Sequence, residues 1–373
     1  MAAMPSEEVP PMTVQADPRD DMTLIVGSYT VSMPHVKAKG EGISVLRLDG
    51  RDGRLKPVST FGGLRNPSYL ALSEDRSRLY VVEEVPDEDG ASAATLSFDG
   101  ETGTLSLLKS VPAMGDAPCH IALDRSGERL FVCNYGSGNF ITYALDADGL
   151  PSGEPVNIRH QSKGANPERQ EGPHLHQATA TPDGRSVLIC DAGTDVIARY
   201  DIASGLIRPS PDMVVKARPG TLPRHLVVSE DGRFVFVVHE LGCTISSYAC
   251  EPEGFRPLTE VSTLPGDFEG SSACAAIRIH PSGRFVYASN RGHDSIAAYE
   301  ILPDDGSLRS IGWYDTRGKA PRDFAIDPTG RTLVAANQDS HSLSVFRIDQ
   351  SSGELTITGE LFDIGSPVCV LFA

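Results

Sequence analysis

Apolar residues along the chain fall into pairs of short runs separated by a polar turn, and this unit recurs six times. Representative copies read PRHLVVSEDGRFVFVVHE (223–240) and CAAIRIHPSGRFVYASNRG (274–292). The turns are rich in Asp, Ser, Pro and Gly, which is typical of tight β-hairpins. The turn residues that align across the copies are Arg76, Gly127, Gly184, Gly232, Gly283 and Gly330, at intervals of 51, 57, 48, 51 and 47 residues.

A third run of alternating or β-branched residues follows each hairpin, for example TISSYAC (244–250), and a weaker fourth run precedes the next copy. Four short strands in each period of about 50 residues are typical of a β-propeller blade. The sequence has no long amphipathic helical pattern, which disfavours α/β folds. We therefore predict an all-β, seven-bladed β-propeller with four-stranded blades.

The two ends of the chain complete the count of blades. Residues 23–30 and 42–49 have the patterns of a second and a third strand, and residues 366–372 have that of the missing first strand. Pairing the C-terminal strand with the N-terminal strands closes the ring and removes an exposed sheet edge. We expect residues 22–373 to form a single domain. Residues 1–21 are rich in Pro and acids and lack signal-peptide features, so we predict a disordered leader there.

Composition and charge exclude several classes of partner. The 373-residue chain has 33 Lys and Arg against 50 Asp and Glu, which gives a net charge of −17. Such a surface argues against nucleic acid or an anionic membrane as partner, because phosphate binding needs a cationic surface. The sequence has no run of 18 apolar residues, so we predict no membrane span. A small anionic substrate remains compatible, since a few local Arg side chains can bind it.

The seven cysteines are odd in number and form no C-x-x-C motif, which disfavours a disulfide framework or a zinc site and fits a reducing cytoplasm. His174 and His176 are two residues apart and could share a metal, but no third ligand accompanies them. The sequence also lacks the glycine-rich loops that bind nucleotides. We therefore expect no metal and no cofactor. The sequence leaves the oligomeric state open.

The repeat also predicts where reactive side chains gather. In a propeller, the first strand of each blade lines the channel and the second runs back, so one channel mouth collects first-strand starts and second-strand ends. The starts are Ser68, Cys119, His176, Arg224, Ala275, Arg322 and Val368. The ends are Glu84, Tyr135, Ala192, Glu240, Arg291 and Gln338, each following a residue such as Asn134.

Four of the ionisable side chains at these positions come from three successive blades. They are His176, Arg224, Glu240 and Arg291, which we interpret as catalytic candidates. The alternative is that they only form ion pairs between blades. We expect substrate contacts from His174, Asn134, Tyr135, Arg322 and Gln338. Arginine suits a carboxylate, a phosphate or an oxyanion, whereas either His176 or Glu240 could activate water. A carboxylate between two arginines would have a lowered pKa and would be the weaker base.

The chain resembles the seven-bladed propeller lactonases, which include propeller-type 6-phosphogluconolactonases and carboxy-cis,cis-muconate lactonizing enzymes. The resemblance is carried by segments such as VGSYT, GPHLHQATATPDGR, PRHLVVSEDGRFVFVVHE and SNRGHDSIAAY, and it extends over nearly all of residues 23–373. It implies a catalytic His, two Arg and a Glu, which match His176 (HLHQ), Arg224 (PRHL), Arg291 (SNRG) and Glu240 (VHE). It also implies that no metal is needed.

The resemblance favours a lactonase of carbohydrate metabolism that hydrolyses a sugar-acid lactone, with 6-phosphogluconolactone as the preferred candidate. In this hypothesis, Arg224 and Arg291 hold the substrate's anionic group and the oxyanion, while His176 or Glu240 activates water. Three alternatives stay open: a cycloisomerase that acts on a muconate, a non-catalytic propeller that binds a protein partner, and a six-bladed, calcium-dependent gluconolactonase.

Overall fold

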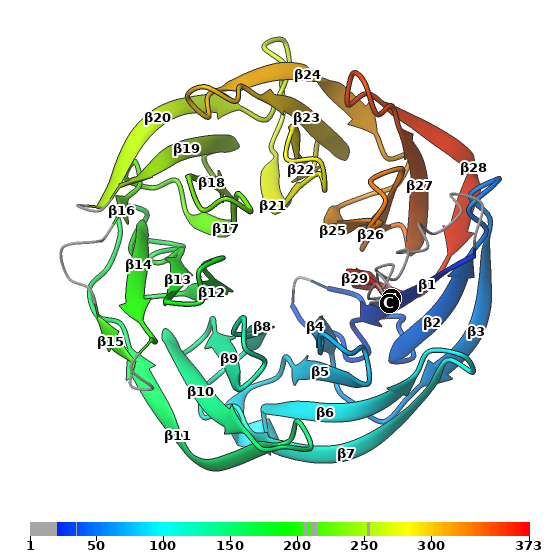
Figure 1. Ribbon diagram of the computed structural model, residues 1–373, viewed down its shortest axis with the longest axis vertical. Coiled ribbons are helices and arrows are strands. Elements are labelled where there is room, and N and C mark those ends of the chain that lie inside the picture. Colours follow the sequence, from blue (N-terminus) through cyan, green and yellow to red (C-terminus); the bar gives the residue numbers. More distant parts are fainter. Residues whose placement is uncertain (1–20, 35, 204–206, 210–214, 252–253) are drawn as a thin grey trace, which may run out of the picture.

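Seven antiparallel sheets stand around a central axis like the blades of a propeller (Figure 1). The computed structural model describes residues 21–34, 36–203, 207–209, 215–251 and 254–373. The predicted leader therefore lies, except for its last residue, outside the described residues. The described part contains one short 3₁₀ turn, Asp87–Asp89, and no other helix. The all-β propeller with seven blades is thus confirmed.

The strands of each blade follow one another from the channel outward. Blade 1 holds β29 (Pro367–Phe372), β1 (Met22–Ser28), β2 (Ile43–Leu48) and β3 (Leu55–Phe61). Blade 2 holds β4 (Pro67–Leu72), β5 (Arg78–Glu83), β6 (Ser92–Asp99) and β7 (Thr104–Pro112). Blade 3 holds β8 (Pro118–Leu123), β9 (Arg129–Asn134), β10 (Asn139–Leu145) and β11 (Pro151–Arg159). Blade 4 holds β12 (Leu175–Ala180), β13 (Ser186–Asp191) and β14 (Val196–Asp201), with β15 (Arg208–Pro209) and β16 (Val215–Lys216) both pairing with β14.

The remaining three blades are regular. Blade 5 holds β17 (Pro223–Val228), β18 (Phe234–His239), β19 (Thr244–Glu251) and β20 (Gly254–Ser262). Blade 6 holds β21 (Ala273–Ile279), β22 (Phe285–Arg291), β23 (Ser295–Ile301) and β24 (Leu308–Asp315). Blade 7 holds β25 (Pro321–Ile326), β26 (Thr332–Asn337), β27 (Ser342–Ile348) and β28 (Leu355–Asp363).

The hairpin turn between the first two strands of a blade explains why the same turn residue recurs along the sequence. The glycine at this position has a φ between +68° and +74° in five blades, a conformation that costs glycine little. The first copy has Arg76 there instead, and this residue also adopts a positive φ of 58°. This turn residue therefore adopts the same left-handed conformation in all six copies.

The C-terminal strand closes the ring as expected. Strand β29 pairs antiparallel with β1, with Leu24 opposite Phe372 and Gly27 opposite Cys369. A Cβ on Gly27 would lie only 2.4 Å from the carbonyl oxygen of Pro67, so this position needs glycine where blades 1 and 2 meet. The ring thus has no open edge between its first and last strands.

The hydrophobic core lies between neighbouring blades. Phe236 of blade 5, for example, belongs to one buried cluster with Ile277 and Val286 of blade 6. A buried side chain of this size stabilises the fold by about 1.5–3 kcal/mol relative to an exposed one. Buried tyrosines also reach across blades, since the Tyr287 hydroxyl donates a hydrogen bond to the carbonyl of Gly353 in blade 7. Within the described residues, there is no helix that could cross a membrane.

Candidate active site

A β-bulge at the start of the inner strands directs side chains into one mouth of the channel. In β12, Leu175 pairs with Asp191 and Gln177 with Cys190, so His176 is an extra residue without a cross-strand partner. The register shifts in the same way around Arg224 in β17 and around Arg322 in β25. A bulge bends its strand and re-aims the extra side chain. The start positions found from the repeat are therefore the bulge residues.

A recurring backbone hydrogen bond brings the second-strand ends beside these bulges. The N–H of Glu240 donates to the carbonyl of Leu222 at 2.7 Å, two residues before the bulge residue Arg224. The N–H of Tyr135 donates in the same way to Ala117, at 3.0 Å. One blade thus presents a bulge side chain and a strand-end side chain as neighbours.

The two sets of positions meet in a cavity of about 530 Å³ at the channel mouth. Its lining residues are Met33, Glu84, Ala117, Cys119, Tyr135, Arg169, His176, Arg224, Glu240, Arg291 and Arg322. All four catalytic candidates are among them, together with Tyr135 and Arg322 from the predicted substrate contacts. The structure therefore brings together side chains from blades that are far apart in the sequence.

The other three predicted contacts are not among the lining residues. Asn134 is fully buried, and its amide donates to the carbonyl of Ala113, because strand alternation turns it away from the channel. His174 stacks on the ring of Tyr135 at 4.5 Å, with its Nδ1 2.8 Å from the Tyr135 carbonyl oxygen. The amide of Gln338 donates to Asp339. These residues support the wall, and their contact with substrate stays a prediction.

Glu240 lies at the centre of a cluster of positive charge. Its Oε1 is 2.8 Å from Nη2 of Arg169, while its Oε2 is 3.3 Å from Nε of Arg224 and 3.4 Å from Nη2 of Arg291. Burial raises the pKa of Glu240, but the three guanidinium groups outweigh this effect and hold the pKa far below its usual range. Glu240 is consequently ionised at neutral pH and is a poor proton acceptor.

The backbone of β21 holds the two deeper arginines in place. Arg224 donates from Nη1 to the carbonyl of Ala275 at 2.6 Å, and Arg291 donates from Nη2 to that of Cys274 at 2.9 Å. Burial, followed by repulsion from Arg291 and Arg322, lowers the pKa of Arg224 to about 10, so it still carries a charge at neutral pH. Both Nε atoms are buried without an aligned hydrogen-bond partner within the described residues. Each of these guanidinium groups is therefore fixed by the backbone and still holds one donor without an aligned acceptor.

His176 is the neutral member of the cluster. Burial lowers the pKa of its imidazole well below the usual range, the charge of Arg224 lowers it further, and Glu240 only partly opposes this. Its Nδ1 lies 3.8 Å from the sulfur of Cys119, whose thiol pKa is raised by burial. Across the described residues, Nε2 has no hydrogen-bond partner. The lowered pKa makes the imidazole a weaker base than an exposed histidine, but it keeps the ring neutral at neutral pH, so that a ring nitrogen can accept a proton.

The opposite wall of the cavity has a different character. The hydroxyl of the buried Tyr29 donates to the carboxylate of Glu84 at 3.0 Å, and the guanidinium of Arg322 lies over the Tyr29 ring at 5.4 Å. Among the described carboxylates, none lies within ion-pairing distance of Arg322. This wall offers a carboxylate and a guanidinium, which are suitable partners for hydroxyl groups.

Sequence reasoning missed Arg169, which reaches the cavity from the connection between β11 and β12 rather than from a blade. The signal was present, since the interval of 57 residues between Gly127 and Gly184 is the longest of the five. It also missed Met33, which lies in the connection between β1 and β2.

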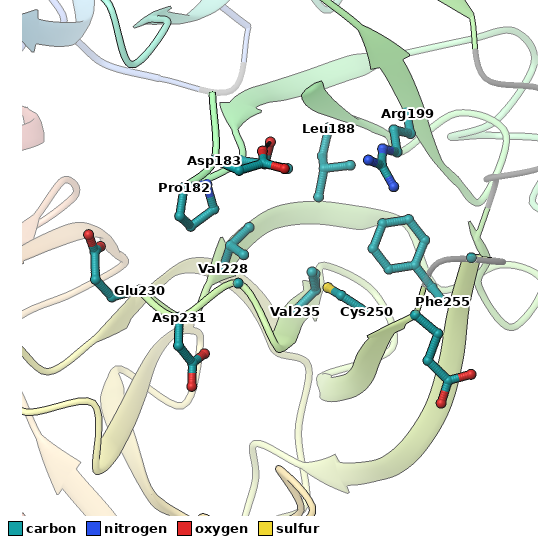
Figure 2. A pocket seen from close by; sticks show the side chains of 14 residues that line it. Pro182, Asp183, Leu188, Arg199, Val228, Glu230, Asp231, Val235, Cys250 and Phe255 are labelled. Atoms are coloured by element: carbon teal, nitrogen blue, oxygen red, sulfur yellow. Dashed lines mark hydrogen bonds between the residues drawn. The ribbon is translucent and has the colours of Figure 1, made fainter. Parts of the chain in front are cut away.

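A second cavity of about 530 Å³ lies between blades 4 and 5, at the far end of their inner hairpins from His176 (Figure 2). Its floor includes Leu188 and Val235, and two of its carboxylates already pair with arginines, Glu230 with Arg125 and Asp231 with Arg233. Nothing in it resembles the cluster around Glu240. Within the described ranges, no group of three or more His, Cys, Asp or Glu side chains is arranged to hold a metal.

Comparisons with known proteins identify the family of the chain. A family model described as "Lactonase, 7-bladed beta-propeller" matches residues 23–372. A Bacillus subtilis protein named 6-phosphogluconolactonase is 33% identical over 349 residues, which cover 93% of this chain and 97% of that protein. An uncharacterized protein from Lactococcus lactis is 34% identical over 351 residues, covering 93% and 98%.

Among solved structures, the periplasmic gluconolactonase of Pseudomonas aeruginosa is 32% identical and superposes with a TM-score of 0.89, covering 95% of this chain and 99% of that one. The family predicted from the sequence motifs is thus confirmed. The chain belongs to the lactonase family of seven-bladed β-propellers.

Proposed function

We propose that the protein hydrolyses a sugar-acid lactone in the cavity at the channel mouth and that 6-phosphogluconolactone is its preferred substrate. The observation that carries this proposal is a neutral imidazole beside a carboxylate that three guanidinium groups surround. The lining holds four Arg and two Glu, so with His176 neutral its formal charge is 4 − 2 = +2 in a protein of net charge −17. This excess suits a substrate that carries a phosphate and develops a further negative charge during reaction.

His176 is the general base in this proposal. Nε2 takes a proton from a water molecule while the water oxygen attacks the lactone carbonyl carbon, which requires the tautomer with its proton on Nδ1, facing Cys119. Glu240 stabilises the imidazolium that forms and does not itself accept the proton, since the surrounding arginines keep its pKa low. For this reason we prefer the histidine to the glutamate as the base.

Arg224 and Arg291 stabilise the tetrahedral oxyanion. Their backbone hydrogen bonds to β21 preorganise the guanidinium groups before substrate arrives, so little reorganisation is needed as charge develops. When the intermediate collapses, the bond between the carbonyl carbon and the ring oxygen breaks. The imidazolium of His176 returns its proton to that oxygen, which becomes a hydroxyl, and the product acid then ionises. Glu84 and Arg322 bind the sugar hydroxyls from the opposite wall.

The names of two relatives support the substrate class. The Bacillus subtilis relative is named 6-phosphogluconolactonase, and the Pseudomonas aeruginosa structure is that of a gluconolactonase. Both names refer to a six-carbon aldonic acid lactone, with and without phosphate. We propose the cytoplasm as the location of this chain, as its cysteine usage predicts.

The test is a hydrolysis panel in which the acid released from each lactone is titrated at constant pH. It compares 6-phosphoglucono-δ-lactone, glucono-δ-lactone and a carboxymuconolactone, each with and without a chelator and after subtraction of spontaneous opening. We expect the phosphorylated lactone to be opened fastest and the chelator to have no effect. Replacing the general base in His176→Asn should lower kcat by about 10²–10⁴-fold, whereas His293→Asn, outside the cavity, should not. Rates that never exceed the spontaneous one would contradict the proposal.

A further inference from the structure

Arg169 differs from the other cavity arginines in where it comes from. Arg224 and Arg291 belong to inner strands of the blades, whereas Arg169 lies in the connection of residues 160–174 between β11 and β12. Its Nη2 lies 2.8 Å from Oε1 of Glu240 and 3.3 Å from the hydroxyl of Tyr135. This side chain therefore reaches the catalytic cluster from the rim.

The connection is built to hold Arg169 over the cavity. The adjacent Gln170 is fully buried; its side chain accepts a hydrogen bond from the N–H of Asn166 and donates one to the carbonyl of Ala192, both at 2.9 Å. Gly164 packs so closely that a Cβ there would lie 2.4 Å from the Gln170 amide carbon. The backbone beside Arg169 is thus fastened to blade 4, and the long side chain extends from this fixed point to Glu240 and Tyr135.

Exposure increases along the cluster from the floor to the rim. The side chain of Arg224 is 3% exposed, that of Arg291 is 19% exposed and that of Arg169 is 40% exposed. A phosphate dianion is costly to bury, whereas a lactone carbonyl is neutral until the reaction begins. A phosphorylated lactone would therefore place its carbonyl beside the two deep arginines and its phosphate at the rim.

We propose that Arg169 binds the distal phosphate of the substrate and so makes the enzyme select phosphorylated sugar-acid lactones over neutral ones. This inference rests on the proposed lactone hydrolysis. Arg169 pairs with Glu240 in the structure; when substrate arrives, its planar guanidinium turns to the phosphate with two parallel hydrogen bonds. Glu240 keeps Arg224 and Arg291 as partners, so the exchange leaves no buried carboxylate unpaired.

The experiment compares two substrates that differ only in the phosphate, 6-phosphoglucono-δ-lactone and glucono-δ-lactone. Arg169→Gln should lower kcat/KM for the phosphorylated lactone by about 10- to 100-fold, mainly through KM, because a charge-assisted hydrogen-bond pair is lost. The same variant should lower kcat/KM for the neutral lactone by a clearly smaller factor, because that substrate loses no direct contact and only the ion pair between Arg169 and Glu240 is removed. Arg169→Lys should recover part of the preference for the phosphorylated lactone, since lysine retains the positive charge but lacks the two parallel N–H donors of a guanidinium.

The matched control is Arg218→Gln, since Arg218 is a half-exposed arginine that pairs with Glu260 at 3.2 Å and does not line the cavity. Calorimetric titration with 6-phosphogluconate and with gluconate gives a readout independent of turnover, and only the phosphorylated acid should bind more weakly to Arg169→Gln. Thermal melting shows whether the variants fold.

Three results would overturn the inference. An equal loss on both lactones would mean that Arg169 acts only by positioning Glu240. A wild-type enzyme that prefers the neutral lactone would show that the rim does not recognise phosphate. If the wild type opens neither lactone, the proposed lactone hydrolysis fails together with this inference. In the first two results, by contrast, lactone hydrolysis stands and only the role of Arg169 fails.

Discussion

Three buried histidines, His176 in the cavity lining and His120 and His225 close to it, should make the protein unusually sensitive to mild acid. The ring of His225 lies 5.7 Å from that of His120 and 5.1 Å from that of His176, and the three residues are at most 5% exposed. Burial lowers the pKa of His120 to about 3 and holds those of His176 and His225 well below their usual range. The folded protein therefore keeps all three imidazoles neutral through the mildly acidic range.

In the unfolded chain, the three imidazoles are exposed to water and bind protons that they do not bind in the folded protein. Below the unfolded pKa of about 6.5, the unfolded state carries more protons, so the free energy of unfolding must fall as pH falls. Each imidazole should lose about 1.4 kcal/mol of stabilisation between pH 8 and pH 5.5, or about 4 kcal/mol for the three. Above pH 8 the effect should be absent, because the imidazoles are then neutral in both states.

Urea unfolding at fixed ionic strength across this pH range measures the effect. His120→Asn and His225→Asn should each flatten the pH dependence by about 1.4 kcal/mol, whatever they do to stability at pH 8. Tyr69→Phe is the control, since its ring packs against His120 at 4.2 Å but contributes no proton in this range. A free energy of unfolding that stays level from pH 8 to 5.5, or variants as steep as the wild type, would refute the reasoning.

Two further substitutions probe the cluster and its support. Glu240→Gln leaves buried guanidinium groups without their counter-charge, so the free energy of unfolding should fall by about 3 kcal/mol and kcat should fall with it, as followed by denaturant unfolding and lactone hydrolysis; unchanged stability would contradict the ion-pair account. Gly193→Ala would place a Cβ 2.0 Å from the carbonyl oxygen of Gly172 and so should displace the connection that carries Arg169. The melting temperature of the Gly193→Ala variant and its kcat/KM for the phosphorylated lactone should both drop. A variant equal to wild type in both would show that the connection accommodates the added methyl group without displacing Arg169.

The repeat allowed much of the cavity to be predicted, because the side chains at its mouth occupy positions set by strand geometry. His176 and Arg224 occupy bulges, and Glu240 follows a strand end, so one register locates all three. Arg169 could not be located this way, since residues 160–174 have no counterpart in the other blades. Asn134 shows what the register alone does not tell: the register places this residue beside the mouth, whereas the alternation of β9 turns its amide into the blade, where it donates to the carbonyl of Ala113.

The choice of base also needed three-dimensional information. The sequence offered two neighbouring arginines for Glu240, and the third contact, to Arg169, depends on how the β11–β12 connection packs against blade 4. Likewise, the depth of burial that keeps His176 neutral arises from blades on all sides of the channel. Pairwise charge and burial are properties of the assembled ring and are not encoded in any single repeat.

The closure of blade 1 has a consequence for biosynthesis. Strand β29, the innermost of that blade, leaves the ribosome after all the other described strands, whereas its partner β1 leaves before them. A nascent chain can stack six complete hairpin units while β1 still exposes unpaired backbone groups along one edge. Until residues 367–372 have been translated, that edge is open to pairing with another polypeptide. Chaperone dependence and aggregation during synthesis should therefore be greatest before these residues are made. A chain truncated before residue 367 would form an incomplete ring in which β1 has an unpaired edge.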